Sequence, residues 1–132
     1  MMRLALALGA LAAAAVARAG PGDEVEVTAG VVTGLSCALD ARAKGNLALL
    51  NACPPTEAGK GMVVFDVAEK RIYRLSSKKV FLYQLESAFG GGSIDFTGTE
   101  VRVDPRTEVA TVDVDEYSVS PKPKAGAFKG CL

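Results

Sequence analysis

The sequence predicts an all-β domain, a five-stranded Greek-key barrel with one or two short helices. Residues 62–75 contain two alternating apolar runs on either side of a polar turn, which is typical of a β-hairpin. Residues 24–34, 94–103 and 109–119 supply three more alternating runs. A helical pattern stands between the third and fourth of these five strands.

The first predicted strand covers residues 24–34, where charged and apolar residues alternate before a valine-rich end. Gly30 interrupts the pattern, as glycine does at a bulge or where a strand bends round a small barrel. Two shorter strands, separated at Gly30, are the alternative interpretation.

The connecting segment 35–61 is the least regular part of the sequence. Asn46 is placed to cap a short helix over residues 47–52, which the prolines at 54 and 55 end. Leu47 and Leu50 are expected to pack on the barrel, with Leu49 as a further candidate. Residues 56–61 form a polar lead into the hairpin.

The hairpin consists of strands at 62–67 and 71–75, joined by a turn at 68–70. A helix is predicted from Ser76 or Ser77 to about Ala88, because apolar residues recur on one face and three glycines follow. That face holds Phe81, Leu85, Ala88 and Phe89, with Val80 nearby. A strand over residues 80–85 is the alternative.

The fourth strand, residues 94–103, changes its apolar phase at Gly98, which predicts a β-bulge there. Ile94 and Phe96 hold one phase, and Val101 and Val103 hold the other. A turn at 104–106 leads to the last strand, residues 109–119. Residues 121–132 are predicted to be a flexible tail.

Residues 1–19 resemble a secretory signal peptide, with Arg3, an apolar run over 4–16 and small residues at 17 and 19, where a signal peptidase requires them. The run is shorter than the roughly 20 residues that span a bilayer, so a weak membrane anchor is only the alternative. The predicted organisation is therefore a signal peptide (1–19), a barrel (20–120) and a tail (121–132). An exported protein follows, periplasmic or extracellular, without a membrane span after cleavage.

The charge balance argues against a nucleic-acid partner. The chain has 15 basic and 15 acidic residues, and cleavage after residue 19 removes two arginines and no acid. The mature chain then carries 13 basic and 15 acidic residues, a formal charge of −2. Overall charge thus offers no attraction to polyanions or anionic membranes.

The three cysteines predict one disulfide in an oxidising compartment. A bond between Cys37 and Cys53 would hold the first connecting segment on the barrel, because Cys37 follows the first strand and Cys53 ends the short helix. It closes a loop of about 17 residues and is worth roughly 3 kcal/mol. Cys131 is then unpaired or links two chains as a dimer. Three free thiols are the alternative.

Five strands with a helix between the third and fourth are the signature of the OB-fold barrel. The sequence also resembles a group of small exported bacterial OB-fold proteins of uncharacterised function. The resemblance covers residues 25–119 and rests on short motifs: 30–34 (GVVTG), Cys37, 44–45 (KG), 52–53 (AC), 63–65 (VVF), 73–75 (YRL) and 96–99 (FTGT). It implies an OB-fold-like barrel in an exported setting and brings no catalytic residue. Asn46 and Leu49 stand where that group tends to have His and Cys, which speaks against a metal or haem role.

The side chains present do not favour an enzyme. The chain contains no histidine, so the usual general base, the commonest metal ligand and any Ser-His or Cys-His pair are missing. No cofactor and no metal are therefore predicted. The acidic residues Asp113, Asp115 and Glu116, close to Asp95 or Glu100 if the strands pair as proposed, fit the solvated face of a strand better than a cation site.

The candidate ligand-binding residues are Arg71, Arg74, Lys78, Lys79 and Tyr83, on and after the hairpin, because OB barrels bind ligands around strands 2 and 3. Lys70 adds to the basic charge, whereas Tyr73 is expected to point inward. A solvated hairpin that binds nothing is the alternative. Replacing Arg71 and Arg74 by alanine is then expected to change stability little.

Two hypotheses of function follow. The first is a non-enzymatic exported binding module for a small molecule, glycan or peptide in the cell envelope. The second is a structural or assembly protein that contacts another envelope protein through its barrel edge or tail.

Overall fold

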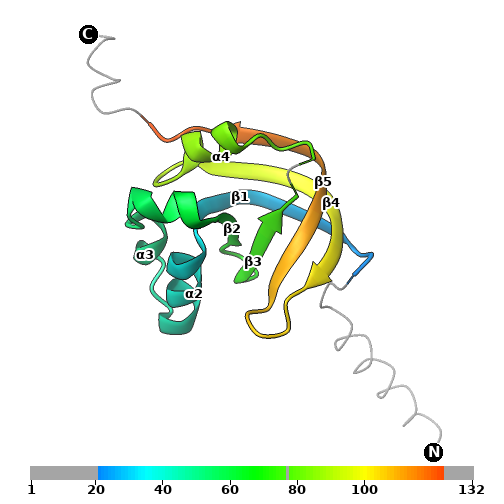
Figure 1. Cartoon of the computed structure of the whole chain (residues 1–132), viewed down its shortest axis with the longest axis horizontal. Coiled ribbons are helices and arrows are strands. Elements are labelled where there is room, and N and C mark those ends of the chain that lie inside the picture. The colour runs from blue at the N-terminus through cyan, green and yellow to red at the C-terminus, as the bar shows by residue number, and fades with distance from the viewer. Residues whose placement is uncertain (1–20, 77, 124–132) are drawn as a thin grey trace, which may run out of the picture.

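The computed structural model describes residues 21–76 and 78–123 and confirms the predicted all-β barrel (Figure 1). Its strands follow the predicted order, and an α-helix over residues 35–44 and a 3₁₀ helix are present in addition to the two predicted helices. In chain order they are β1 (Glu24–Gly34), α2 (Leu35–Lys44), α3 (Ala48–Asn51), the 3₁₀ helix η1 (Pro55–Lys60), β2 (Met62–Asp66), β3 (Arg71–Leu75), α4 (Leu82–Ala88), β4 (Ser93–Val103) and β5 (Val109–Ser120).

The five strands form a closed barrel in the order β1-β2-β3-β5-β4, with β4 returning to β1. The pairing of β3 with β5 is parallel and every other pair is antiparallel. This order, with α4 between β3 and β4, is OB-fold-like. The barrel is closed by the β1–β4 pairing, whereas an OB barrel is often partly open.

The predicted bulge of β1 is confirmed. The register of β1 against β4 shifts between Val27 and Gly30, where Ala29 takes a φ of 55° and its N–H donates to Asp95 at 2.6 Å. A Cβ at Gly30 would lie 2.4 Å from a side-chain carbon of Val64. Glycine is therefore required here, because β1 bends against the barrel interior.

The bulge at Gly98 is also confirmed, but the phase of β4 changes later than predicted. The register of β4 against β5 shifts between Thr97 and Gly98 and again between Glu100 and Arg102. Val101 is the extra residue at the second shift, so it is 47% exposed instead of buried. Glu100 keeps the inward phase and is fully buried.

The inner core fills the barrel with buried residues from all five strands, among them Val27, Val64, Tyr73, Phe96 and Val112. Leu85 and Ala88 of α4 join this core, so α4 closes one end of the barrel.

Helix α4 is shorter than predicted. It begins at Leu82, with the extended Phe81 as its N-cap, and is followed by the glycines at 90–92 as expected. Phe81 is 58% exposed, so its placement on the buried face was wrong. The alternative of a strand over residues 80–85 is also wrong.

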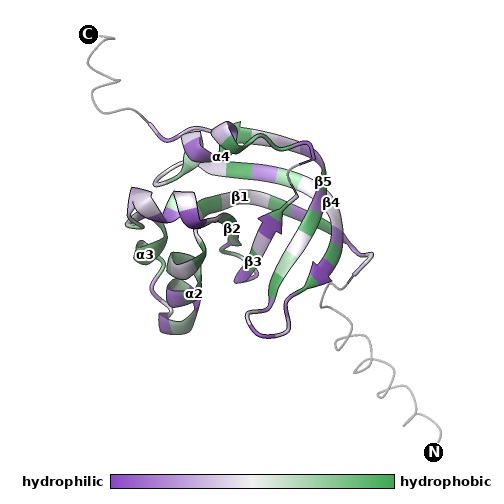
Figure 2. Ribbon diagram, in the orientation of Figure 1, coloured by the Kyte–Doolittle hydropathy of each residue, from purple (hydrophilic) through white to green (hydrophobic). Residues whose placement is uncertain are grey.

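An outer core lies on the other side of β2 and β3, beneath α2 and α3 (Figure 1). It joins the outward residues Val63, Phe65 and Ile72 to small residues of α2 and to Leu50 of α3, and it includes Val109. Because β2 is buried on both sides, it is hydrophobic along almost its whole length (Figure 2).

Leu50 is buried in this outer core and Leu49 is partly buried, as predicted, but Leu47 is 43% exposed, which corrects the prediction for that residue. Asn46 accepts a hydrogen bond from the N–H of Ala48 at 3.1 Å, but the N-cap of α3 is Leu47, which makes no side-chain cap, so the prediction that Asn46 caps this helix is corrected.

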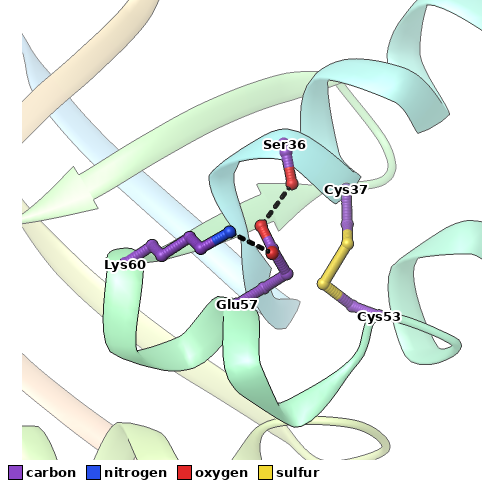
Figure 3. Close-up of polar contacts among 5 residues, drawn as sticks. All are labelled: Ser36, Cys37, Cys53, Glu57 and Lys60. Atoms are coloured by element: carbon purple, nitrogen blue, oxygen red, sulfur yellow. Dashed lines mark hydrogen bonds and ion pairs between the residues drawn. A yellow bond between two sulfur atoms is a disulfide. The ribbon is translucent and has the colours of Figure 1, made fainter.

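The predicted disulfide between Cys37 and Cys53 is present, and it ties α2 to the end of α3 (Figure 3). Beside it, Glu57 of η1 accepts hydrogen bonds from Ser36 at 2.6 Å and from Lys60 at 3.0 Å. These two bonds, that from Ser36 above all, lower the pKa of Glu57. The first connecting segment is thus a crosslinked cover on the barrel.

The predicted signal peptide, Cys131 and most of the predicted tail lie outside the described residues. Within the described part of the chain, no helix has the length and apolar character that a membrane crossing requires.

Candidate functional site

The outward face of β2 and β3, where OB barrels commonly bind ligands, is covered by the chain itself. Val63 and Phe65 of β2 and Ile72 of β3 pack beneath the disulfide-held segment and are no more than 1% exposed. A ligand therefore has no access to the apolar part of this face. Open space is present at the edge of this cover, toward β5.

A pocket of about 550 Å³ lies at that edge. Its volume is within the range of small-ligand sites, roughly 300–1,000 Å³. Its lining comes from β3, from the end of β4, from the turn between β4 and β5, from β5 and from the start of α2. The lining residues are Leu35, Arg74, Arg102, Val103, Asp104, Pro105, Arg106, Thr107, Val109 and Thr111. We call this the arginine pocket.

Two segments that contribute to the arginine pocket, α2 and the β4–β5 turn, are joined by a hydrogen bond. A guanidinium N–H of Arg42 in α2 donates to the carbonyl oxygen of Thr107 in the β4–β5 turn at 2.6 Å. The turn itself is held by Asp104, whose carboxylate accepts the N–H of Arg106 at 2.9 Å. That backbone hydrogen bond is the main cause of the lowered pKa of Asp104.

Arg71, the first predicted ligand-binding residue, has a partner inside the protein. Its guanidinium lies 3.2 Å from a carboxylate oxygen of Glu100 and 5.4 Å from the ring centre of Tyr73. The other oxygen of Glu100 is buried without a hydrogen-bond partner among the described residues. Arg71 thus neutralises a buried carboxylate, and the expectation that its removal changes stability little is revised.

Of the other predicted residues, Arg74 alone lines the arginine pocket. Lys78 lies 3.9 Å from a carboxylate oxygen of Asp113, and Lys79 donates to a backbone carbonyl of β5 at 3.4 Å. Tyr83 is 67% exposed at the start of α4, as predicted, and stacks on Phe81. The structure therefore separates the five predicted residues instead of gathering them in one site.

A second hollow, of about 630 Å³, lies over β1, β4 and β5 on another part of the barrel surface. Four of its ten lining residues are acidic and none is basic; the acidic ones are Glu26, Asp95, Asp115 and Glu116. No group of three or more His, Cys, Asp or Glu residues in the described ranges is arranged to hold a metal ion. We call this the acidic groove.

The sequence analysis missed the contributions of Leu35, Arg102 and Arg106 to the arginine pocket. The sequence does show Arg102 and Arg106 close together, shortly before Thr111 on the next strand. Only the strand register shows that these residues belong to one site, because Thr111 pairs with Arg102 on one side and with Arg74 on the other.

The chain was also compared with family models, curated proteins and solved structures. None of them matches it. The function is therefore inferred from the residues of this chain and their arrangement.

Proposed function

We propose that this protein is an exported, non-enzymatic binding module that takes a small molecule, glycan or peptide of the cell envelope in the arginine pocket. The observation that carries the proposal is the pocket's construction. The start of the segment that covers the usual ligand face and the β4–β5 turn line one pocket together with Thr111 of β5. A concave space with both apolar and polar walls is the usual form of a ligand site.

Export is part of the same proposal, and two features support it. The first residues have the pattern of a signal peptide, and the Cys37–Cys53 disulfide requires an oxidising compartment to persist. Intact-mass analysis of the exported protein is expected to show that residues 1–19 are missing. A mature protein that retains the apolar run would contradict this part of the proposal.

The absence of histidine from the chain supports a binding role over an enzymatic one. OB-fold-like barrels use the connections after β1 and β4 for recognition, and the same two connections contribute to the arginine pocket. The suspected kinship with small exported OB-fold proteins is consistent with this role.

The test is a thermal-shift panel of envelope glycans, peptides and small molecules, since a ligand that binds only the folded state raises the melting temperature. Two variants locate any hit. Thr111→Trp places a bulky side chain in the arginine pocket, and Thr97→Trp places the same bulk at a half-buried threonine of the acidic groove. We expect the shift to be lost in Thr111→Trp and kept in Thr97→Trp. The reverse pattern, or a panel without any hit, would contradict the proposal.

A structural or assembly role is the second candidate, and one observation favours it. Phe81, Leu82 and Tyr83 are consecutive and are 58%, 66% and 67% exposed. Adjacent exposed apolar side chains mark protein contacts more often than chance exposure does. Co-purification of an envelope protein that is lost when these three residues are changed to serine would favour this role. A Cys131-linked dimer on non-reducing gels would also favour it.

A further inference from the structure

The strand register places two arginines of the arginine pocket on opposite sides of one threonine. Thr111 of β5 pairs with Arg74 of β3 and with Arg102 of β4, so the three residues form a row across neighbouring strands. Directly paired residues share a face of a sheet, and adjacent strands are about 4.8 Å apart. The two arginine backbones are therefore roughly 10 Å apart, with a hydroxyl between them. The β4–β5 turn brings a third arginine, Arg106, to the same pocket.

None of these three guanidinium groups has an ion pair or a hydrogen bond within residues 21–76 and 78–123. The one acidic residue of the lining, Asp104, accepts the backbone N–H of Arg106 and feels that residue's positive charge as well. It offsets one of three positive charges. Arginine stays protonated at any physiological pH, so the pocket keeps an excess of positive charge.

Elsewhere in the structure, buried or half-buried charges have partners. Arg71 has Glu100, and Arg42 has the carbonyl of Thr107. Arg74 is half-buried as well, yet its guanidinium lies beside Gly61 without an acceptor among the described residues. Guanidinium groups form their strongest hydrogen bonds with carboxylate, sulfate and phosphate oxygens, often two at once.

Apart from the polar Thr107, the rest of the lining is apolar. It consists of Leu35, Val103, Pro105 and Val109. A ligand that fills the pocket therefore meets apolar surface beside the three arginines. The acidic groove on another part of the barrel would repel a ligand of negative charge, so electrostatics favours the arginine pocket over that groove.

We propose that the ligand of this pocket is an anion: a carboxylate, sulfate or phosphate group that lies over Thr111 between Arg74 and Arg102, with Arg106 closing over it and an apolar body against Leu35. This inference rests on the proposed function and narrows its ligand class. It explains why the half-buried Arg74 has no acceptor among the described residues, whereas Arg102 and Arg106 are exposed.

The test uses defined probes and chemical-shift titration of the ¹⁵N-labelled mature protein at constant ionic strength. The probes are inorganic sulfate, inorganic phosphate and 4-phenylbutyrate, and the neutral control is 4-phenylbutyramide. We expect saturable shifts at Thr111 and in residues 104–107 with the anions, and none with the amide. Comparison of the three anions shows which oxyanion the pocket prefers.

Two variants show whether the arginines are responsible. The double variant Arg74→Gln and Arg102→Gln removes two positive charges from the pocket, and the double variant Lys44→Gln and Lys70→Gln removes two exposed charges outside it. We expect the first to weaken anion binding at least about tenfold, because hydrogen bonds to charged groups are lost. The second is expected to change it less than about twofold, because Lys44 and Lys70 do not line the pocket and distant exposed charges are screened.

Equal weakening in both variants, or equal binding of acid and amide, would overturn the anion inference. The outcome for the proposed function is separate. If a neutral ligand from the thermal-shift panel is blocked by Thr111→Trp while the anions do not bind, the binding module stands and the anion inference fails. If neither anions nor panel ligands reach the pocket, both fail.

Discussion

The two apolar cores of this protein share β2 and β3 but differ in what holds their covers in place. The inner core is enclosed by five strands whose hydrogen-bonded pairing closes on itself, and α4 seals one end. The outer core is covered by two helices of 10 and 4 residues that add nothing to the sheet. Helices of this length are marginal alone in water, so their position depends on side-chain fastenings.

Three such fastenings are present: the Cys37–Cys53 disulfide, the hydrogen bond from Thr33 to the carbonyl of Leu50 at 2.8 Å, and the Arg42–Thr107 contact. The repeated backbone hydrogen bonds between strands are enough to enclose the inner core. A cover made of loops and short helices instead needs individual side-chain bonds and crosslinks to stay in place. This difference predicts that damage to the inner core is global and that damage to the outer cover is local.

The largest effect is expected for Phe96→Ala in the inner core. Phe96 is 2% exposed and its ring packs edge-on against Tyr73. Removing a buried aromatic side chain costs roughly 3–5 kcal/mol of unfolding free energy. Hydrogen exchange is expected to rise in the whole barrel, measured beside denaturant unfolding. Phe96→Leu is the matched control and should lose less than half as much.

The double change Cys37→Ser and Cys53→Ser is expected to cost about 3 kcal/mol, because the unfolded chain regains the freedom of the closed loop. It is made in a Cys131→Ser background to prevent exchange of partners. Hydrogen exchange should rise first in α2 and α3, while the barrel strands stay protected. Equal acceleration throughout the barrel would contradict the comparison of the two cores, and a dominant disulfide to Cys131 in the parent protein would contradict the bond itself.

Arg71→Ala tests the charged end of the inner core and is expected to cost about 2 kcal/mol, since it leaves the Glu100 carboxylate buried without its partner. Adding Glu100→Gln removes the unpaired charge and should restore part of the loss. Denaturant unfolding of the two single variants and the double variant measures the coupling. Simple addition of the two losses would show that the contact contributes nothing.

Thr33→Val removes the hydroxyl that holds α3 while keeping the side-chain shape. The carbonyl of Leu50 then loses its buried partner, at a cost of about 1.5 kcal/mol. Thr33→Ser keeps the hydroxyl and is the control. Exchange of the α3 amides should accelerate in the valine variant and not in the serine variant.

The smallest effect is expected for Leu47→Ala, within about 0.5 kcal/mol, because Leu47 is 43% exposed. Leu50→Ala, three residues on in the same helical segment, is its contrast and should cost roughly 2–5 kcal/mol, since Leu50 is 1% exposed. Similar losses in thermal or denaturant unfolding would mean that the outer core is not organised around Leu50.

The strands could be predicted from the sequence because most of them alternate apolar and polar residues, while β2 is a short apolar run next to a polar turn. Gly30 and Gly98 marked both bulges. Helix α2 was missed because its buried residues are Ala38 and Ala41, whose small side chains give little apolar periodicity. Their size lets the helix approach β2 closely, which is a tertiary reason that local pattern does not contain.

The phase of β4 was assigned from its apolar residues, with a switch at Gly98 that gives Val101 and Val103 the second phase. The buried phase instead continues to Glu100, whose charge Arg71 compensates from another strand, and Val101 is exposed. The arginine pocket was missed for a related reason. Arg74 and Arg102 are 28 positions apart in the chain and meet only through the register of Thr111.

The bulge at Gly30 also divides β1 between two partners, and this division bears on the order of folding. Residues 31–34 pair with β2, which follows soon in the chain, whereas Glu24 pairs with Thr99, 75 positions later. Contacts so distant form late because the intervening chain must first be ordered. We therefore expect the pairing of β1 with β4 to form late in folding. Until then, the N-terminal half of β1 has no strand partner on that side. Glu24 and Glu26, both exposed, give this half of β1 charges that oppose pairing with another chain.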